Sequence, residues 1–453
     1  MRAKGATETT GRGEGGEPAG IRGVSQCVAM KLPGDPYLRY RDGVLSLDDC
    51  ALGELARHHG TPTYIYSRPA MLAALAPYQR ALVGRKHLLC YAMKANSNLA
   101  VLQTFARAGC GFDIVSGGEL QRVLAAGGDA ARVVFSGVGK TREEMRQALE
   151  AGVRCFNVES DAELEVLSQV SSEMGRIAPV SLRVNPDVDP LTHPYISTGL
   201  KGNKFGIAHE RALDAYRRAA DLPGLRVVGI DCHIGSQITE VGPYLNALER
   251  LLDLVDGIEA TGIATIDHLD LGGGLGITYT DEAPPPADVL IARLLERIDA
   301  RGHGHREVLL EPGRSLVGNA GVLLTTVLYL KHGERKNFCI VDAAMNDLVR
   351  PAMYQATMAI VPCEQRTGPA TRWDIVGPIC ESGDWLGRDR DLAVRPGDIL
   401  AVLSAGAYGM GMASNYNSRP RAAEVMVDGA QAWLIRERES IADLWRGEHL
   451  IDG

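Results

Sequence analysis

Residues 88–109 read LLCYAMKANSNLAVLQTFARAG, and this stretch joins two different hydrophobic patterns. A short apolar run, LLCYAM, leads into Lys94. The run that follows has apolar residues at positions i, i+3, i+4 and i+7. The first pattern predicts a buried strand and the second predicts an amphipathic helix. The stretch is therefore a strand–helix pair with a lysine at the end of its strand.

The same pairing recurs along the chain, with helical patterns such as GELQRVLAAGG and TREEMRQALEAG between the apolar runs. Continuously apolar strands that alternate with helices indicate parallel strands covered on both faces. Eight such units predict a closed (β/α)8 TIM barrel, and a doubly wound open sheet is the alternative. The predicted strands are Leu88–Met93, Phe112–Val115, Arg132–Ser136, Cys155–Val158, Val180–Val184, Val227–Ile234, Ile266–Leu271 and Glu307–Glu311.

The pattern changes on both sides of the predicted barrel, which we assign to residues 86–314. Beyond it, runs such as GVLLTTVLYLKHG are bounded by Gly, Pro, Asn and Asp, which predicts a C-terminal antiparallel β-domain over residues 315–453. Before it, YLRYRDGVLSLDD predicts a hairpin at Asp42-Gly43 and then a short helix. Residues 30–85 are expected to join the β-domain in part. Residues 1–29 lack the apolar core of a secretory signal and are expected to be a disordered tail, or an untranslated segment before Met30.

Composition excludes several classes of function. The net charge of −8 argues against nucleic acid as a partner. No apolar run approaches the roughly 20 residues of a membrane-spanning helix. The 9 cysteines contain no CxxC pair, and their odd number does not fit a disulfide framework. Reduced thiols in the cytoplasm are the simpler interpretation.

The unusual polar residues fall where this barrel places its active site, at the carboxyl ends of the strands. Lys94 ends the first predicted strand, His233 lies near the end of the sixth, the run Gly272–Gly276 follows the seventh, and Glu311 ends the eighth. Each alone has an ordinary structural explanation: a surface lysine, a core histidine, a turn, or half of an ion pair. Their placement on one rim favours a functional site.

These residue types together fit the chemistry of pyridoxal 5′-phosphate. Glycine backbone after the seventh strand lets N–H groups approach a phosphate. A lysine forms a Schiff base with an aldehyde cofactor. A carboxylate that faces the pyridine nitrogen keeps the ring protonated, so that it accepts electrons, and a flat imidazole stacks on the ring. No His, Asp and Glu set has the spacing of metal ligands, so no metal is predicted.

The motifs YAMKAN, FDIVSGGEL, HIGSQ, LGGGLGI, EPGRS, PICESGD and GAYGMGMASNYNSRPRAAEV, taken together, resemble those of the diaminopimelate decarboxylases. These are fold-type III pyridoxal-phosphate enzymes related to ornithine and arginine decarboxylases and, more distantly, to alanine racemase. The resemblance covers about residues 35 to 450. It implies decarboxylation of meso-2,6-diaminopimelate to L-lysine and CO₂, the last step of lysine biosynthesis.

The resemblance also implies a role for each matching cofactor residue. Lys94 is similar to the Schiff-base lysine, His233 to the residue stacked on the ring, and Glu311 to the partner of the pyridine nitrogen. Arg314 is similar to an arginine that contacts both phosphate and substrate. The remaining implied cofactor contacts, mostly to the phosphate, are Ser236, Gly272, Gly273, Gly274, Gly276 and Gly313.

The substrate contacts implied from the β-domain are Arg350, Tyr354, Glu381 and Tyr408, of which Tyr408 also contacts the cofactor. Cys380 resembles a proton donor that reaches the active site of the partner subunit, which implies a homodimer with shared active sites. Diaminopimelate has a distal ammonium and a distal carboxylate, which Glu381 and Arg350 suit by charge.

Four other interpretations remain open at this point. Another decarboxylase of the same fold would act on ornithine, lysine or arginine, and Arg350 disfavours it. An amino-acid racemase is disfavoured by Glu311. A non-catalytic pyridoxal-phosphate carrier is disfavoured by the predicted β-domain and Cys380. A plain structural protein is the weakest alternative.

Overall fold

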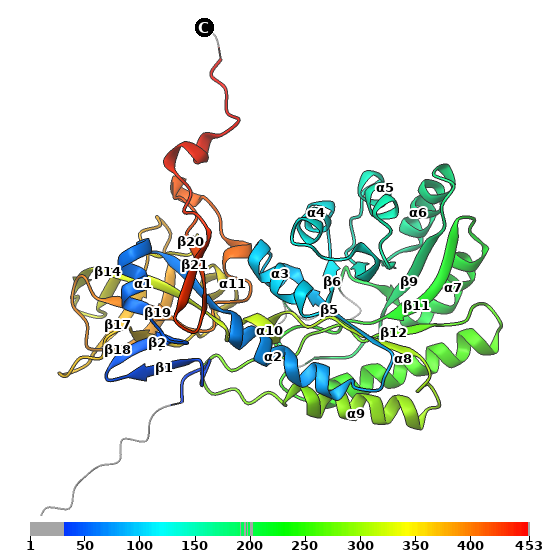
Figure 1. Cartoon of the computed structure of the whole chain (residues 1–453), viewed down its shortest axis with the longest axis horizontal. Helices are drawn as coiled ribbons and strands as arrows, with labels where there is room; N and C mark the ends of the chain where they lie inside the picture. The colour runs from blue at the N-terminus through cyan, green and yellow to red at the C-terminus, as the bar shows by residue number, and fades with distance from the viewer. Residues whose placement is uncertain (1–30, 191, 194–195, 197, 200–202, 452–453) are drawn as a thin grey trace, which may run out of the picture. The chain divides into compact units, whose positions relative to one another are not determined.

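The middle part of the chain folds into a closed barrel of parallel strands (Figure 1). The computed structural model describes residues 31–190, 192–193, 196, 198–199 and 203–451, so the predicted tail, residues 1–29, lies outside the described residues. Pairing of β13 with β5 and of β8 with β9 completes the ring. The predicted closed barrel is therefore confirmed, and the open sheet is wrong. The eight strands are β5 (His87–Ala92), β6 (Gly111–Ile114), β7 (Val133–Phe135), β8 (Cys155–Val158), β9 (Ala178–Asn185), β11 (Leu225–Asp231), β12 (His268–Asp270) and β13 (Glu307–Leu310).

Local sequence explains where the outer helices begin. The side chain of Asn98 accepts a hydrogen bond from Ala100 N–H at the start of α3, and Ser116 and Ser160 cap α4 and α6 in the same way. Thr141 and Glu144 form a capping box on α5. Among the described residues, no helix is both long enough and apolar enough to span a membrane. The helices are α3 (Leu99–Arg107), α4 (Gly117–Ala125), α5 (Arg142–Ala151), α6 (Asp161–Glu173), α7 (Ala212–Asp221), α8 (Gly242–Ala260) and α9 (Ala287–Ala300).

The barrel interior has an apolar layer and a polar layer. Leu88, Cys90, Val134, Cys155, Val228 and Leu309 form one buried cluster inside the ring. Side chains two residues apart on a strand share a face, so Asn157 and Glu311 follow Cys155 and Leu309 toward the carboxyl ends of the strands. Asp113 and Asp270 are also fully buried at strand ends. Branched apolar residues usually fill a barrel of this type, so this polar layer points to a function at the mouth.

The C-terminal sheet is mainly antiparallel, as predicted, but it also contains two parallel pairs, β15 with β17 and β20 with β4. The sequence pattern did not predict β18, because its sequence WLGRDRDL carries several charges and is only partly buried. Its strands are β4 (Thr63–Ser67), β14 (Gly321–Lys331), β15 (Phe338–Val341), β16 (Ile360–Pro362), β17 (Thr371–Val376), β18 (Trp385–Leu392), β19 (Ile399–Val402), β20 (Ala423–Asp428) and β21 (Gln431–Arg436).

The N-terminal hairpin forms where the sequence predicts it. Strands β1 (Leu38–Arg41) and β2 (Val44–Leu47) pair across Asp42 and Gly43, whose φ angles are 49° and 79°. Two positive φ angles are what the tightest hairpin turn requires. With β3 (Cys50–Ala51) the hairpin makes a separate 3-stranded sheet, followed by α1 (Leu52–His59). The strand of this region that enters the large sheet is β4, which lies between β14 and β20. Helix α2 (Arg68–Ala81) then leads into the barrel.

Candidate active site

Lys94 lies in the turn after β5, at the carboxyl end of the barrel. Its Nζ forms an ion pair with Oδ2 of Asp113, which is fully buried on the neighbouring strand β6. The side chain of Lys94 is 38% exposed, and although partial desolvation at the barrel mouth opposes its charge, Asp113 and Glu311 outweigh this and raise the pKa of the amine above its ordinary value. The amine is therefore protonated in this structure and must lose a proton before it attacks an aldehyde.

Glu311 follows β13 and is only 7% exposed. Its backbone N–H donates a hydrogen bond to the carbonyl of Gly272 at 2.7 Å, whereas its Oε1 has no partner among the described residues. Buried polar atoms almost always have partners, so an unpartnered oxygen here points to a ligand group. Burial, together with Asp113 and two further carboxyls, raises the pKa of Glu311.

The two further carboxyls belong to Asp231 and Asp270, which end β11 and β12. One oxygen from each of Asp231, Asp270 and Glu311 lies within 4.8 Å of the other two. Two unit charges about 5 Å apart repel by roughly 3 kcal/mol at an effective dielectric constant of about 20. The three groups therefore resist full ionisation together, and we call them the carboxyl cluster.

His233 lies just beyond β11 and is hydrogen-bonded to the glycine run. Its Nδ1 accepts a hydrogen bond from the backbone N–H of Gly273 at 3.2 Å. Burial, with Arg183 and Lys94 nearby, holds the pKa of His233 well below its ordinary value. The imidazole is therefore neutral, with a fixed tautomer and a fixed orientation, as stacking on a flat ring requires.

Only glycine fits two positions of the run that follows β12. A Cβ on Gly273 would lie 2.1 Å from the carbonyl oxygen of Glu311, and one on Gly274 would lie 2.3 Å from that of Gly235. Gly274 also has a φ angle of 105°. The run therefore packs directly against the backbone that follows β11 and β13.

The backbone donors of this run are not equivalent. The N–H groups of Gly272, Gly273 and Gly276 donate to Asp270 Oδ1, His233 Nδ1 and the carbonyl of Ile238. Of the four predicted glycines, Gly274 alone has an N–H without an acceptor among the described residues. A phosphate would therefore be met by Gly274 N–H, while the other three glycines shape the run.

Arg314 begins α10 (Arg314–Val317) directly after Gly313 and is 4% exposed. Its guanidinium donates to the hydroxyl of Ser236 at 2.8 Å and to the hydroxyl of Tyr279. Gly313 packs closely against Ala92 and Ala95, the residues on either side of Met93 and Lys94. A Cβ on Gly313 would lie 3.2 Å from both, so the absence of a side chain permits this packing. The structure thus brings Ser236, Gly313 and Arg314 to the same mouth as Lys94.

Arg350 begins α11 (Arg350–Tyr354) in the β-domain and is also 4% exposed. Its guanidinium lies 5.2 Å from the ring centre of Tyr354 and 5.9 Å from that of Tyr408. No ion pair or hydrogen bond to it is found within the described part of the chain. Burial, with Arg314 nearby, lowers its pKa. A buried arginine without an anion is costly, so a negatively charged ligand group is expected here.

Tyr408 joins the β-domain to the lysine segment. Its backbone N–H donates to the carbonyl of Ala95 at 2.7 Å, and its ring centre lies 4.8 Å from the guanidinium of Arg314. Its φ angle of 55° is uncommon for a tyrosine. Such strain persists where surrounding contacts hold a residue in place, here at the junction of the two domains.

Cys380 and Glu381 are not bonded to this group in the described part of the chain. Both are exposed in the segment between β17 and β18. The backbone N–H of Cys380 donates to Asn417 Oδ1 at 3.1 Å, and the hydroxyl of Tyr416 donates to Glu381 Oε1 at 2.5 Å. In the described residues, no hydrogen bond or ion pair links either one to Lys94, Arg314 or Arg350. The other predicted site residues are brought together, and these two are not.

The structure adds site residues that the sequence analysis did not identify: Asp113, Asp231, Asp270, Arg183 and Tyr279. Tyr279 is 4% exposed and touches both site arginines. Arg183 lies 3.9 Å from Asp231 and 3.2 Å from Glu159. The available signal was a charged residue inside an otherwise apolar strand, such as Asp113 in FDIV.

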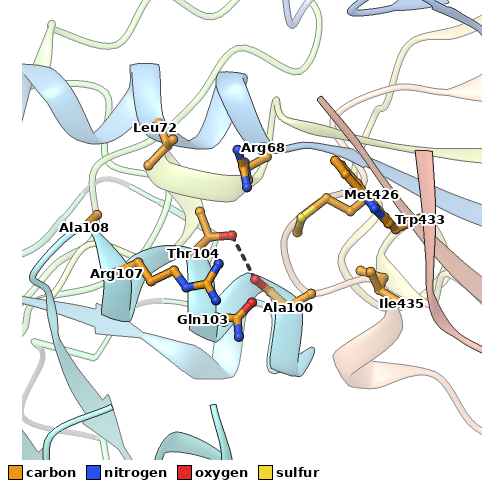
Figure 2. A pocket seen from close by; sticks show the side chains of 10 residues that line it. All are labelled: Arg68, Leu72, Ala100, Gln103, Thr104, Arg107, Ala108, Met426, Trp433 and Ile435. Carbon is orange, nitrogen blue, oxygen red and sulfur yellow. Dashed lines mark hydrogen bonds between the residues drawn. The ribbon is translucent and has the colours of Figure 1, made fainter. Parts of the chain in front are cut away.

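A cavity of about 640 Å³ lies elsewhere, between α2, α3 and the β20–β21 hairpin. Arg68, Arg107, Met426 and Trp433 are among the side chains around it, and a hydrogen bond from Thr104 to the carbonyl of Ala100 runs along its wall (Figure 2). None of the active-site residues described above lines it. Open volume alone therefore does not mark the active site of this protein.

Comparisons with known proteins agree with the geometry. Residues 70–318 match the pyridoxal binding domain of the pyridoxal-dependent decarboxylases. The diaminopimelate decarboxylase of Pseudomonas aeruginosa is 60% identical over 91% of this chain and 98% of that protein. That of Haemophilus influenzae is 52% identical over 92% of this chain and 100% of that protein.

Solved structures give the same result. The diaminopimelate decarboxylase of Helicobacter pylori complexed with L-lysine has a TM-score of 0.83 and 41% identity, and covers 87% of this chain and 98% of its own. That of M. jannaschii in co-complex with L-lysine has a TM-score of 0.88 and 39% identity, over 92% and 99%. A lysine decarboxylase from Selenomonas ruminantium is more distant, at 25% identity. Fold, site and relatives together place the chain in the diaminopimelate decarboxylase family of pyridoxal-dependent decarboxylases.

Proposed function

We propose that this protein decarboxylates meso-2,6-diaminopimelate to L-lysine and CO₂, with pyridoxal 5′-phosphate as its cofactor. The observation that carries the choice of substrate is Arg350, a buried guanidinium with no anionic partner in the described residues. It lies beside the cofactor residues, where the far end of an amino-acid substrate would reach. A distal carboxylate of the substrate would form an ion pair with the guanidinium of Arg350.

The residues at the barrel mouth fit the cofactor. Lys94 supplies the amine that holds its aldehyde, and Glu311 offers a buried, unpartnered oxygen for its pyridine nitrogen. Gly274 N–H, Ser236 and Arg314 offer donors for its phosphate, and His233 offers a neutral flat ring. When bound, the cofactor supplies an electron-accepting ring that stabilises the charge left by departing CO₂.

Asp113 has a direct part in preparing Lys94. It is the carboxylate nearest to the amine and holds it as an ammonium. To form a Schiff base with the cofactor, Nζ would have to give up this proton, and Asp113 would hold the amine in place beside the aldehyde. Arg314 would contact both the phosphate of the cofactor and the substrate.

Substrate selection follows from charge. Lysine, ornithine and arginine lack a distal carboxylate and would leave Arg350 buried and unpaired, which disfavours them by several kcal/mol. Tyr354 and Tyr408 flank the guanidinium and limit its movement. Glu381 would pair with the distal ammonium. Because Glu381 is exposed and its side chain is bonded to Tyr416, we assign it to the site of a partner subunit.

Cys380 is the proposed donor of the proton to the α-carbon, also in the partner's site. This assignment makes the active unit a homodimer with shared sites, and we place it in the cytoplasm, where thiols stay reduced. Exposure of Cys380 supports the proposal, since all but one of the other described cysteines are buried. No role for nucleic acid or membrane is proposed.

The test is CO₂ release by the cofactor-loaded protein with meso-diaminopimelate, L-lysine, L-ornithine and L-arginine in separate assays. Release from diaminopimelate alone, with lysine as product, is the expected result. Release from another of the four would retain Lys94 and Glu311 but overturn the role of Arg350. No release from any of them, despite bound cofactor, would favour a racemase or a carrier.

A further inference from the structure

The carboxyl cluster is an arrangement that folding alone does not favour. Asp231 and Asp270 are direct partners across β11 and β12, and Glu311 lies on the next strand end. Their exposed fractions are 1%, 0% and 7%. Like charges directly opposite each other destabilise a sheet. Burial makes the repulsion stronger, because water no longer screens the groups.

Backbone contacts hold two of the three groups in register. Asp270 Oδ1 accepts the N–H of Gly272 at 3.0 Å, while the carbonyl of Gly272 accepts the N–H of Glu311 at 2.7 Å. Asp270 and Glu311 therefore share one glycine, and their carboxyls face the same space. Asp231 Oδ1 and Glu311 Oε1 have no donor among the described residues, whereas the side-chain amide of Asn157 lies within reach of Asp270. A proton kept on one carboxyl group is the hydrogen-bond donor that the cluster can supply to its other oxygens.

The nearby cations are already paired. Lys94 pairs with Asp113, and Arg183 lies nearer to Glu159 than to Asp231. Burial raises the pKa of Asp270 to about 6 and raises those of Asp231 and Glu311 well above the ordinary range. The titratable groups that interact with the cluster from the surrounding elements are Cys90, Lys94, Asp113, Cys155, Glu159, Arg183, Tyr216 and Cys232.

We propose that Asp270, backed by Asp231, is a positioning residue that keeps a proton on the cluster and supplies it, through Glu311, to the pyridine nitrogen when the cofactor binds. The proton leaves the Glu311 carboxyl oxygen and forms the N–H bond of the ring, so Glu311 becomes the carboxylate that faces it. Asp270 and Asp231 keep any second proton within the cluster. The proposal rests on the cofactor assignment given above and extends it to residues behind Glu311.

The first test uses cofactor-free protein and measures thermal unfolding from pH 4.5 to 8. An acid whose pKa is raised by folding destabilises the native state as pH rises from its unfolded pKa to its folded pKa. Asp270→Asn keeps an oxygen for Gly272 N–H but removes the ionisation. Its unfolding temperature should therefore rise relative to that of the wild type by about 1–3 °C between pH 4.5 and 7, and the difference should keep growing to pH 8 while the wild-type cluster still holds a proton.

Two further variants make this test decisive. Ser181→Ala removes a buried, unpartnered hydroxyl from β9 without removing a carboxyl, so its difference from the wild type should not depend on pH. Asp231→Asn should behave like Asp270→Asn and replaces it if Asp270→Asn does not fold. A difference that stays flat with pH in both asparagine variants would overturn the retained proton.

The second test measures proton uptake when pyridoxal 5′-phosphate binds, by calorimetry at pH 7.5 in buffers of different ionisation enthalpy. The wild type supplies the ring proton from the cluster, whereas Asp270→Asn leaves Glu311 ionised and must draw it from solvent. On binding the cofactor, Asp270→Asn should take up about one proton more than the wild type does, and Ser181→Ala should match the wild type. Equal uptake would overturn the transfer. Neither test uses an amino-acid substrate, so failure of the substrate assignment would leave both results unchanged.

Discussion

The guanidinium of Arg350 is enclosed by the rings of Tyr279, Tyr354 and Tyr408, within 5.9 Å of each ring centre. Aromatic faces attract a cation, but they do not replace the hydrogen bonds that a carboxylate gives to a guanidinium. The chain thus accepts a stability cost at this residue. Such a cost is expected where a side chain is kept for binding and not for folding.

Arg350→Met should separate binding from folding. Removing one side of a buried charge pair costs about 2–5 kcal/mol, so kcat/KM for diaminopimelate should fall by about 30-fold or more. Cofactor affinity, measured by absorbance, should change little. The cofactor-free variant should unfold at a higher temperature, because an unpaired buried charge is gone. Arg107→Met, at the separate cavity, is the control and should leave kcat/KM unchanged. Undiminished turnover by Arg350→Met would remove Arg350 from the site.

Lys94 and Asp113 predict a pH effect on cofactor attachment. Asp113 holds the amine protonated, so attachment to cofactor-free protein should speed up as pH rises. In Asp113→Asn the counter-charge is lost and burial, which favours the neutral amine, prevails. The rate–pH profile should therefore move to lower pH, as stopped-flow absorbance would show. A profile that stays in place would mean that Asp113 does not control Lys94.

At the scale of elements, the glycine run after β12 decides whether the phosphate site exists. Gly274→Ala would force a positive φ on alanine and bring its Cβ to 2.3 Å from the carbonyl oxygen of Gly235. We expect a loss of about 2 kcal/mol in stability and at least a tenfold loss of cofactor affinity. Gly242→Ala is the matched control in the first turn of α8, where an added Cβ meets nothing within 4 Å. Calorimetric unfolding and an absorbance titration would measure both effects.

Elements were also the scale at which sequence patterns succeeded best. Strand–helix alternation predicts the barrel units directly, and the strand-end rule places Lys94, His233 and Glu311 at one mouth. The same patterns could not predict that β4 enters the large sheet between β14 and β20, because periodicity contains no strand order. A lone acid such as Asp270 in an apolar strand signals burial but not which groups it faces. The carboxyl cluster therefore became visible only when β11, β12 and β13 were placed side by side.

At the scale of the whole molecule, the barrel and the β-domain both contribute to one site. The backbone N–H of Tyr408 donates a hydrogen bond to the carbonyl of Ala95, next to Lys94, and Arg350 lies near Arg314. The described chain nevertheless leaves Cys380 and Glu381 exposed and without a bond to that site. If Cys380 is the proton donor, as proposed, another subunit would carry it into the site. Two-fold symmetry would exchange these residues between two copies and complete both sites at once.

Mixing two inactive variants tests this arrangement. Lys94→Ala and Cys380→Ala should each lack activity alone, the first for want of the amine and the second for want of the proton donor. If subunits exchange at random, half of the dimers contain one chain of each kind. Each such dimer has one site with both native residues, so the mixture should recover about a quarter of wild-type CO₂ release. Recovery should appear only after subunit exchange by dilution or mild denaturant. An exchanged mixture that stays inactive would show that Cys380 acts within its own chain or not at all.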